Sequence, residues 1–67
     1  MIKCYLSRHM GDRKVKIAEL ARELDVNRST ISALYHETAQ LVDLKVMEKL
    51  CEYFGCGVGD LFEYRKD

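Results

Sequence analysis

The sequence lacks proline and tryptophan, holds only four glycines, and has no apolar run approaching the roughly eighteen residues of a membrane span. The absence of proline permits a nearly continuous series of helices, and the absence of a span predicts no membrane partner. With 67 residues, we expect one domain over 1–67, because a chain this short buries only about 60% of its unfolded surface. A two-domain enzyme with a cleft between its domains is therefore excluded.

Cysteine is also scarce, and the three residues present, Cys4, Cys51 and Cys56, do not form a disulfide framework. A secreted chain of this size usually carries an even set of cysteines, so the odd number predicts a reducing cytoplasm. Cys51 falls on the core face of a predicted helix, and we interpret such cysteines as small buried apolar residues rather than metal ligands. No further side chain orients a Cys–His pair for nucleophilic chemistry, so we expect no metal, no cofactor and no enzyme.

The formal net charge is zero, which by itself argues against a nucleic-acid partner, but the charges are unevenly distributed. Residues 1–36 contain seven Lys and Arg against four Asp and Glu, and residues 37–67 contain four against seven. A dipolar domain of this kind can present a basic face to phosphates although its total charge cancels. An asymmetry of this size also arises by chance, so charge alone leaves the partner open.

Apolar residues recur with a helical period along the whole chain, and no alternating pattern predicts a strand. We therefore expect an all-α fold, a compact five-helix bundle without strands. Ile2, Leu6 and Met10 lie four residues apart, which places them on one face of a first helix that Gly11 ends. The five expected helices cover residues 2–10, 16–24, 28–36, 44–54 and 57–64, and we expect 65–67 to be frayed.

Apolar stripes on these helices predict one shared core. The third helix should turn Ile31, Leu34 and Tyr35 inward. The expected core face of the fourth helix comprises Leu44, Met47, Leu50, Cys51 and Phe54. The residues expected to share one core are Leu20, Ile31, Leu34, Leu50 and Phe54.

Residues 16–36 contain the most informative pattern, two short amphipathic helices joined by a three-residue turn. Asp25 tolerates a left-handed backbone, Val26 offers an apolar side chain to bury between the helices, and Asn27 is a strong N-cap for the next helix. This is the layout of a helix-turn-helix, in which the first helix braces the second across the DNA backbone.

The outward face of the helix expected over 28–36 suits a DNA groove. Arg28 stands at its leading end, where a guanidinium fork can reach guanine O6 and N7. Ser29 and Ser32 are short, so the backbone can approach closely, and the free N–H groups at the start of the helix favour a nearby phosphate. The plainer alternatives are a solvated charge at Arg28 and ordinary small surface residues at the two serines, and the residues by themselves leave both interpretations open.

The segment KIAELARELDVNRSTISALY, residues 16–35, resembles the helix-turn-helix of the Cro/phage-repressor type, whose fold is lambda-repressor-like. The tail over 43–64 is similar to the short single-domain bacterial branch of that family, so the resemblance covers about residues 2–64. It implies a five-helix bacterial or phage transcription regulator that binds double-stranded DNA. It also implies phosphate contacts at the start of the second helix and around His36 and Thr38. The implied base contacts are Arg28, Ser29, Thr30, Ser32 and Ala33.

The sequence departs from the family pattern at three places. Ile17 stands where the family often has a glutamine that grips a phosphate, and Lys14 and Lys16 can attract that phosphate electrostatically instead. Asp25 stands where the family often has glycine in the turn. The usual proline near Val58 is absent, which does not affect the expected DNA contacts.

Two functions from different classes fit these features. The first is a sequence-specific DNA-binding transcriptional regulator that places residues 28–36 in the major groove and acts as a homodimer. It needs no small-molecule effector, because no ligand domain follows the helix-turn-helix, and its expected dimer contact lies around Val58, Phe62 and Tyr64. The alternative is a protein-interaction module of the same fold, such as a toxin-neutralising antitoxin, which would use the acidic C-terminal half.

Overall fold

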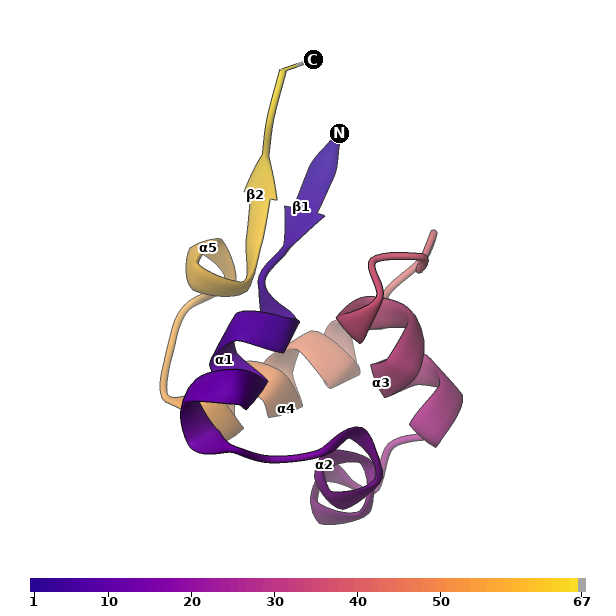
Figure 1. Ribbon diagram of the computed structural model, residues 1–67. Coiled ribbons are helices and arrows are strands. Elements are labelled where there is room, and N and C mark those ends of the chain that lie inside the picture. Colours follow the sequence, from indigo (N-terminus) through magenta and orange to yellow (C-terminus); the bar gives the residue numbers. More distant parts are fainter. Residues whose placement is uncertain (67) are drawn as a thin grey trace.

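Residues 1–66 are described by a computed structural model, in which helices and two short strands follow one another along the chain. The elements are β1 (Ile2–Cys4), α1 (Leu6–Arg13), α2 (Ile17–Leu24), α3 (Arg28–Tyr35), α4 (Leu44–Phe54), α5 (Val58–Leu61) and β2 (Phe62–Tyr64). Figure 1 shows the helices gathered into one body, from which β1 and β2 extend side by side as a narrow ribbon. The mostly helical fold is confirmed, and the expectation of a fold without strands is wrong.

The N-terminal apolar residues form a strand and then a helix, instead of the single helix that their spacing predicted. Ile2 lies in β1 with 61% of its surface exposed, whereas Leu6 and Met10 are buried on α1. Gly11 lies within α1, which ends only where Lys14 takes a left-handed backbone with φ 56°. A spacing of four residues fits both arrangements, and the strand that pairs with this segment comes from the other end of the chain.

β1 and β2 pair in an antiparallel arrangement that continues beyond the strands themselves. The Arg65 N–H donates to the Met1 carbonyl at 2.9 Å. On the side chains, the Tyr5 hydroxyl donates to the Glu63 carboxylate and accepts a bond from the Arg65 guanidinium at 2.7 Å. The expected fraying of the C-terminus is therefore wrong for Arg65, and Asp67 lies outside the described residues.

One apolar core joins β1 and the helices of the body. Its buried members are Cys4, Leu6, Met10, Val15, Leu20, Ala21, Ile31, Leu34, Leu50, Phe54 and Leu61. All the residues expected to share one core are among them, so that prediction is confirmed. Ile31 and Leu34 bring α3 into the core, which leaves the opposite side of this helix free.

Three of the residues predicted to face the core do not pack in it, and the half-buried Met47 is one of them. Leu44, the first residue of α4, is 78% exposed, and Tyr35, the last residue of α3, is 37% exposed. The core stripe of α4 instead runs through Val46, Leu50 and Phe54, which are spaced four residues apart. Residues at helix ends belong to an apolar stripe by sequence, but the neighbouring elements decide whether anything covers them.

The ends of α4 and α5 are determined by local chemistry. The Asp43 carboxylate accepts the Lys45 N–H at 2.7 Å, and Gly55 ends α4 with φ 63°. The last helix is shorter than expected, because it ends at Leu61 and the chain enters β2 at Phe62. Within residues 1–66, no helix combines the length and apolar character that a membrane crossing requires.

Candidate nucleic-acid interface

The turn between α2 and α3 has two hydrogen bonds that close the end of α2. Asp25 adopts a left-handed backbone with φ 54°, as the sequence predicted, and its N–H donates to the Arg22 carbonyl at 3.3 Å. The Val26 N–H donates to the Ala21 carbonyl at 3.0 Å, and the Val26 side chain packs partly buried against the core. This pair of bonds is a Schellman ending. The chain therefore leaves α2 sharply, and α3 begins at Arg28 after three intervening residues.

A long side chain from α4 strengthens the end of α2. The Lys49 ammonium donates to the Leu24 carbonyl at 3.0 Å, where the last carbonyls of a helix lack partners within it. At the other end of α2, the Glu19 carboxylate accepts the Lys16 N–H at 3.4 Å, which is the acidic half of a capping box. The sequence does not predict this contact, because Lys49 lies 25 positions away from Leu24 and no local pattern links the two.

The leading turn of α3 is exposed and its shape is determined by its cap. Asn27 accepts the Ser29 N–H at 2.9 Å through its side-chain oxygen, which confirms it as the N-cap. Arg28 and Ser29 are exposed, while Ser32 and Ala33 are half-buried one turn later. These side chains lie opposite the buried residues of α3. Thr30 is half-buried at the margin of this surface.

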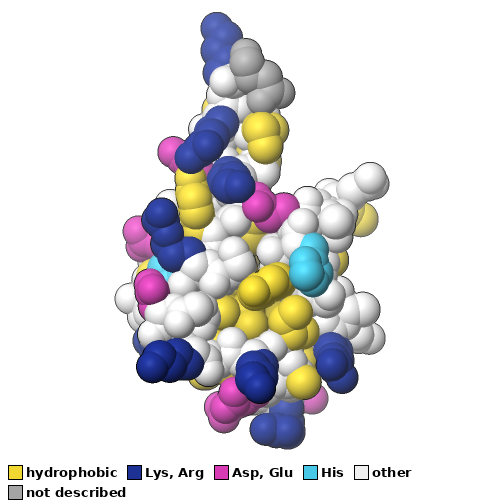
Figure 2. All heavy atoms as spheres, viewed as in Figure 1, with side chains coloured by type: hydrophobic (Ala, Val, Ile, Leu, Met, Phe, Trp, Pro, Cys, Tyr) yellow, Lys and Arg dark blue, Asp and Glu magenta, His cyan; other side chains and the backbone are white. Residues whose placement is uncertain are grey.

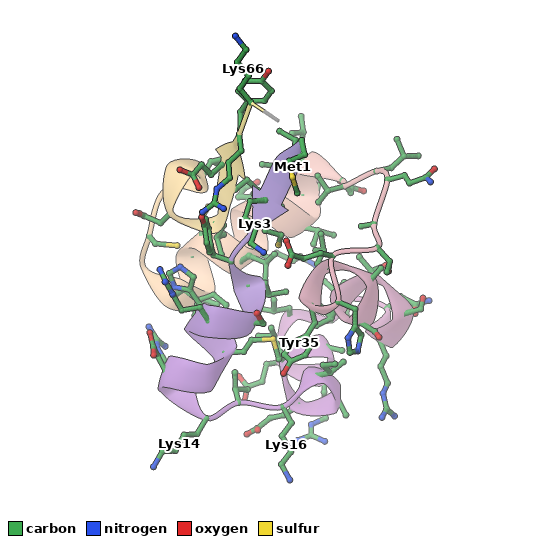
Figure 3. All side chains as sticks on the ribbon, turned by 45° about the horizontal axis from the view of Figure 1, so that its top comes forward. Met1, Lys3, Lys14, Lys16, Tyr35 and Lys66 are labelled. Atoms are coloured by element: carbon green, nitrogen blue, oxygen red, sulfur yellow. The ribbon has the colours of Figure 1, made fainter. Side chains whose placement is uncertain are left out.

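The two lysines before α2 lie on the outside of the molecule. Lys14 and Lys16 are both exposed, and Figure 3 shows them pointing outward from the same edge. Within residues 1–66, neither lysine forms an ion pair, and the same is true of Arg28. Their charges therefore remain available to a phosphate or a base edge.

His36 and Thr38 lie at the far end of α3. His36 follows the last helical residue, and its ring meets the Tyr35 ring edge to face at 5.0 Å between centroids. The Thr38 N–H donates to the Ala33 carbonyl at 2.8 Å, and its hydroxyl donates to the same oxygen at 3.4 Å. Thr38 therefore closes the helix, while the exposed His36 ring lies next to the exposed Tyr35.

Basic side chains surround the helix-turn-helix on the face shown in Figure 2. Lys and Arg are spaced around the lower half of that face, over α1, α2 and the start of α3, with apolar groups between them. Acidic side chains are fewer in this region and lie mainly near its lower edge and beside the strands. The excess of basic residues in 1–36 is thus partly displayed on this face.

The cysteine thiols are buried or half-buried. Burial raises the pKa of the Cys4 thiol, and burial followed by the neighbouring Cys51 raises the pKa of the Cys56 thiol. A raised pKa keeps a thiol protonated and unreactive. Among residues 1–66, no three His, Cys, Asp or Glu side chains come together in a way that could hold a metal ion.

The arrangement of two short helices, a Schellman turn and an exposed capped helix agrees with a comparison against protein families. The family model described as the Cro/C1-type HTH DNA-binding domain matches residues 5–67. The chain belongs to this family. A curated relative, the "Uncharacterized HTH-type transcriptional regulator YozG" of Bacillus subtilis (strain 168), is 29% identical over 58 residues, which cover 87% of this chain and 69% of the relative. The resemblance seen in the sequence is thereby confirmed for this Cro/C1-type chain.

Proposed function

We propose that this protein is a sequence-specific DNA-binding transcriptional regulator that places α3 in the major groove. The observation that carries the proposal is the exposed leading turn of α3, capped by Asn27 and anchored by buried residues on its opposite side. An α-helix fits the major groove, which is about 12 Å wide. The family match and the regulator-like relative support the same function.

The base-reading surface consists of one side of α3. Arg28 is exposed and carries no ion pair within residues 1–66, so its guanidinium is free to donate two parallel bonds to one guanine. Ser29 lies beside it in the same turn. Ser32, Ala33 and Thr30 are less exposed and would contact base edges only at close approach.

The phosphate contacts would flank this surface on two sides. Lys14 and Lys16 stand before α2, and His36 and Thr38 follow α3. Positive charge attracts the DNA backbone irrespective of sequence and releases counterions, so these contacts give binding a steep salt dependence. They position the helix, and the residues of α3 specify the bases.

We propose that the protein binds DNA as a homodimer, because one helix covers too few base pairs for useful specificity. Two-fold proteins read half-sites about 34 Å apart. Val58 is 50% exposed and Tyr64 is 72% exposed, and Phe62 lies half-buried between them in sequence. These apolar surfaces make the C-terminal segment the candidate interface. Sedimentation with and without duplex measures the stoichiometry, and one protomer protecting a non-palindromic site at saturation would contradict a dimer.

Selection from random duplexes, followed by a salt titration of the selected site, tests the function itself. A regulator of this kind should select a defined motif. Its binding to that motif should persist in the presence of competitor DNA, and its affinity should fall steeply as the salt concentration rises. Tight binding to a protein partner without any duplex affinity would instead favour the interaction module. The proposal requires no catalytic residue, cofactor or small-molecule effector.

A further inference from the structure

The N-cap of α3 controls more than the start of the helix, because it also engages the hydroxyl of Ser29. The Ser29 Oγ lies 2.8 Å from the Asn27 Oδ1, and the Ser29 N–H donates to the same atom at 2.9 Å. A backbone N–H cannot donate to an amide NH2 group. The shared atom must therefore be the amide oxygen, which establishes the orientation of the Asn27 side chain from its contacts.

This orientation determines the direction of the second bond. An amide oxygen has no proton, so the Ser29 hydroxyl must be the donor in its bond to Asn27. A serine hydroxyl has one proton and two lone pairs. With its proton engaged by Asn27, the exposed Ser29 Oγ presents only lone pairs to a molecule that approaches α3.

We propose that Ser29 reads a base edge that donates a hydrogen bond, namely the N6 amino group of adenine or the N4 amino group of cytosine. The inference rests on the proposed placement of α3 in the major groove and names the class of base that this position accepts. In the major groove, cytosine offers an amino donor and adenine offers one beside its N7 acceptor, whereas thymine O4 and guanine O6 and N7 are acceptors only. Acceptors would face the lone pairs of Ser29 and repel them.

Ser32 provides an internal comparison on the same helix. It is half-buried one turn further along α3, and within residues 1–66 its hydroxyl has no hydrogen-bond partner. A hydroxyl that rotates freely can donate or accept, so it matches either kind of base edge. Ser29 therefore discriminates between donor and acceptor edges because of Asn27, and Ser32 does not.

The test begins with duplexes selected by the wild-type protein and compares binding to all four base pairs at each position of the motif. The wild-type protein should prefer adenine or cytosine at one position per half-site, by about two- to tenfold, the range of a single net hydrogen bond. Ser29→Ala should remove this preference and leave the position read by Arg28 unchanged. Ser32→Ala should leave the preference at the Ser29 position intact.

Two variants of Asn27 leave the Ser29 hydroxyl in place and test whether the direction of its hydrogen bond determines the base preference. Asn27→Gly keeps the helix start, since glycine is an acceptable N-cap, but frees the Ser29 proton, so guanine and thymine should now be accepted at that position. Asn27→Asp retains an acceptor oxygen, so the adenine or cytosine preference should remain while its added negative charge weakens binding to every duplex. Circular dichroism confirms that each variant is folded.

The outcomes distinguish this inference from the function on which it rests. If the wild-type protein selects no duplex motif, the proposed function fails and the inference fails with it. If a motif with an Arg28-dependent position is found, the inference alone is overturned by any of three results. These are a guanine or thymine preference at the Ser29 position, no position that depends on Ser29, or an unchanged adenine or cytosine preference in Asn27→Gly.

Discussion

The carboxylate of Glu37 accepts a hydrogen bond from the backbone N–H of Cys4, with 3.1 Å between Glu37 Oε1 and Cys4 N. Its second oxygen binds the Lys3 ammonium at 3.0 Å. The Tyr5 N–H donates to the Leu61 carbonyl on the β2 side at 2.8 Å, so the alternation of an antiparallel pair turns the Cys4 N–H toward the free edge of β1. Glu37 follows directly after the cap of α3 and therefore ties the end of that helix to the sheet.

The first prediction concerns stability in acid. The bond from Lys3, followed by the Cys4 N–H, lowers the pKa of Glu37 below its ordinary value of 4.5, and the bond from Tyr5 does the same for Glu63. A carboxyl group whose pKa is lower in the folded protein stabilises the fold at pH values above its ordinary pKa. This contribution is lost as the pH falls through the pKa of the folded protein. Thermal melting should therefore shift to lower temperature below about pH 4.5, and less so in the Glu37→Gln, Glu63→Gln double variant.

Glu48→Gln is the matched control for this effect. Its side chain makes no hydrogen bond within residues 1–66, so the substitution should leave the acid sensitivity of the melting temperature as in the wild type. Equal acid sensitivity in the double variant and in the wild type would show that the two bonded carboxylates do not contribute.

The second prediction contrasts two leucines that the sequence had placed in the same core. Leu34 is 4% exposed and Leu44 is 78% exposed. Leu34→Ala should lower the free energy of unfolding by about 2–5 kcal/mol, because it removes buried methyl groups and leaves a cavity. Leu44→Ala should change it by no more than about 0.5 kcal/mol, as an exposed substitution does. Urea unfolding measures both, and equal losses would contradict the orientation of α4.

The third prediction separates base recognition from phosphate attraction. Arg28→Ala should weaken binding by roughly 1–3 kcal/mol and relax the preference at one base position per half-site. Lys16→Ala should weaken binding to all sequences, reduce the salt slope and leave the preference unchanged. Both substitutions remove one positive charge, so each serves as the control for the other in a fluorescence anisotropy titration. Identical effects on every duplex would reduce Arg28 to a phosphate contact.

The fourth prediction uses two residues that share a left-handed backbone at a helix end. Lys14 has φ 56° and Asp25 has φ 54°. Aspartate tolerates this conformation better than lysine, so Lys14→Gly should raise the free energy of unfolding by about 0.5–1 kcal/mol and Asp25→Gly by less. Urea unfolding of the two variants tests the order. A larger gain from Asp25→Gly would show that backbone strain is not what distinguishes them.

Much of the candidate site could be predicted because its determinants are local. Asn27 and Asp43 cap helices with side chains that reach the backbone two residues away, and Gly55 ends α4 through its own backbone freedom. The left-handed turn at Asp25 and the half-buried Val26 follow from residues within one helical turn. Such contacts depend little on the rest of the chain, so the order of residues alone specifies them.

The same order does not specify contacts between distant segments. The sequence by itself determined the helix-turn-helix, its caps and the apolar residues that share the core. The tertiary structure alone decided that residues 2–4 pair with residues 62–64, that Tyr35 and Leu44 face solvent, and that Lys49 closes the end of α2. Those outcomes depend on which surfaces meet after the chain has folded, because burial and non-local hydrogen bonds are properties of the assembled neighbours.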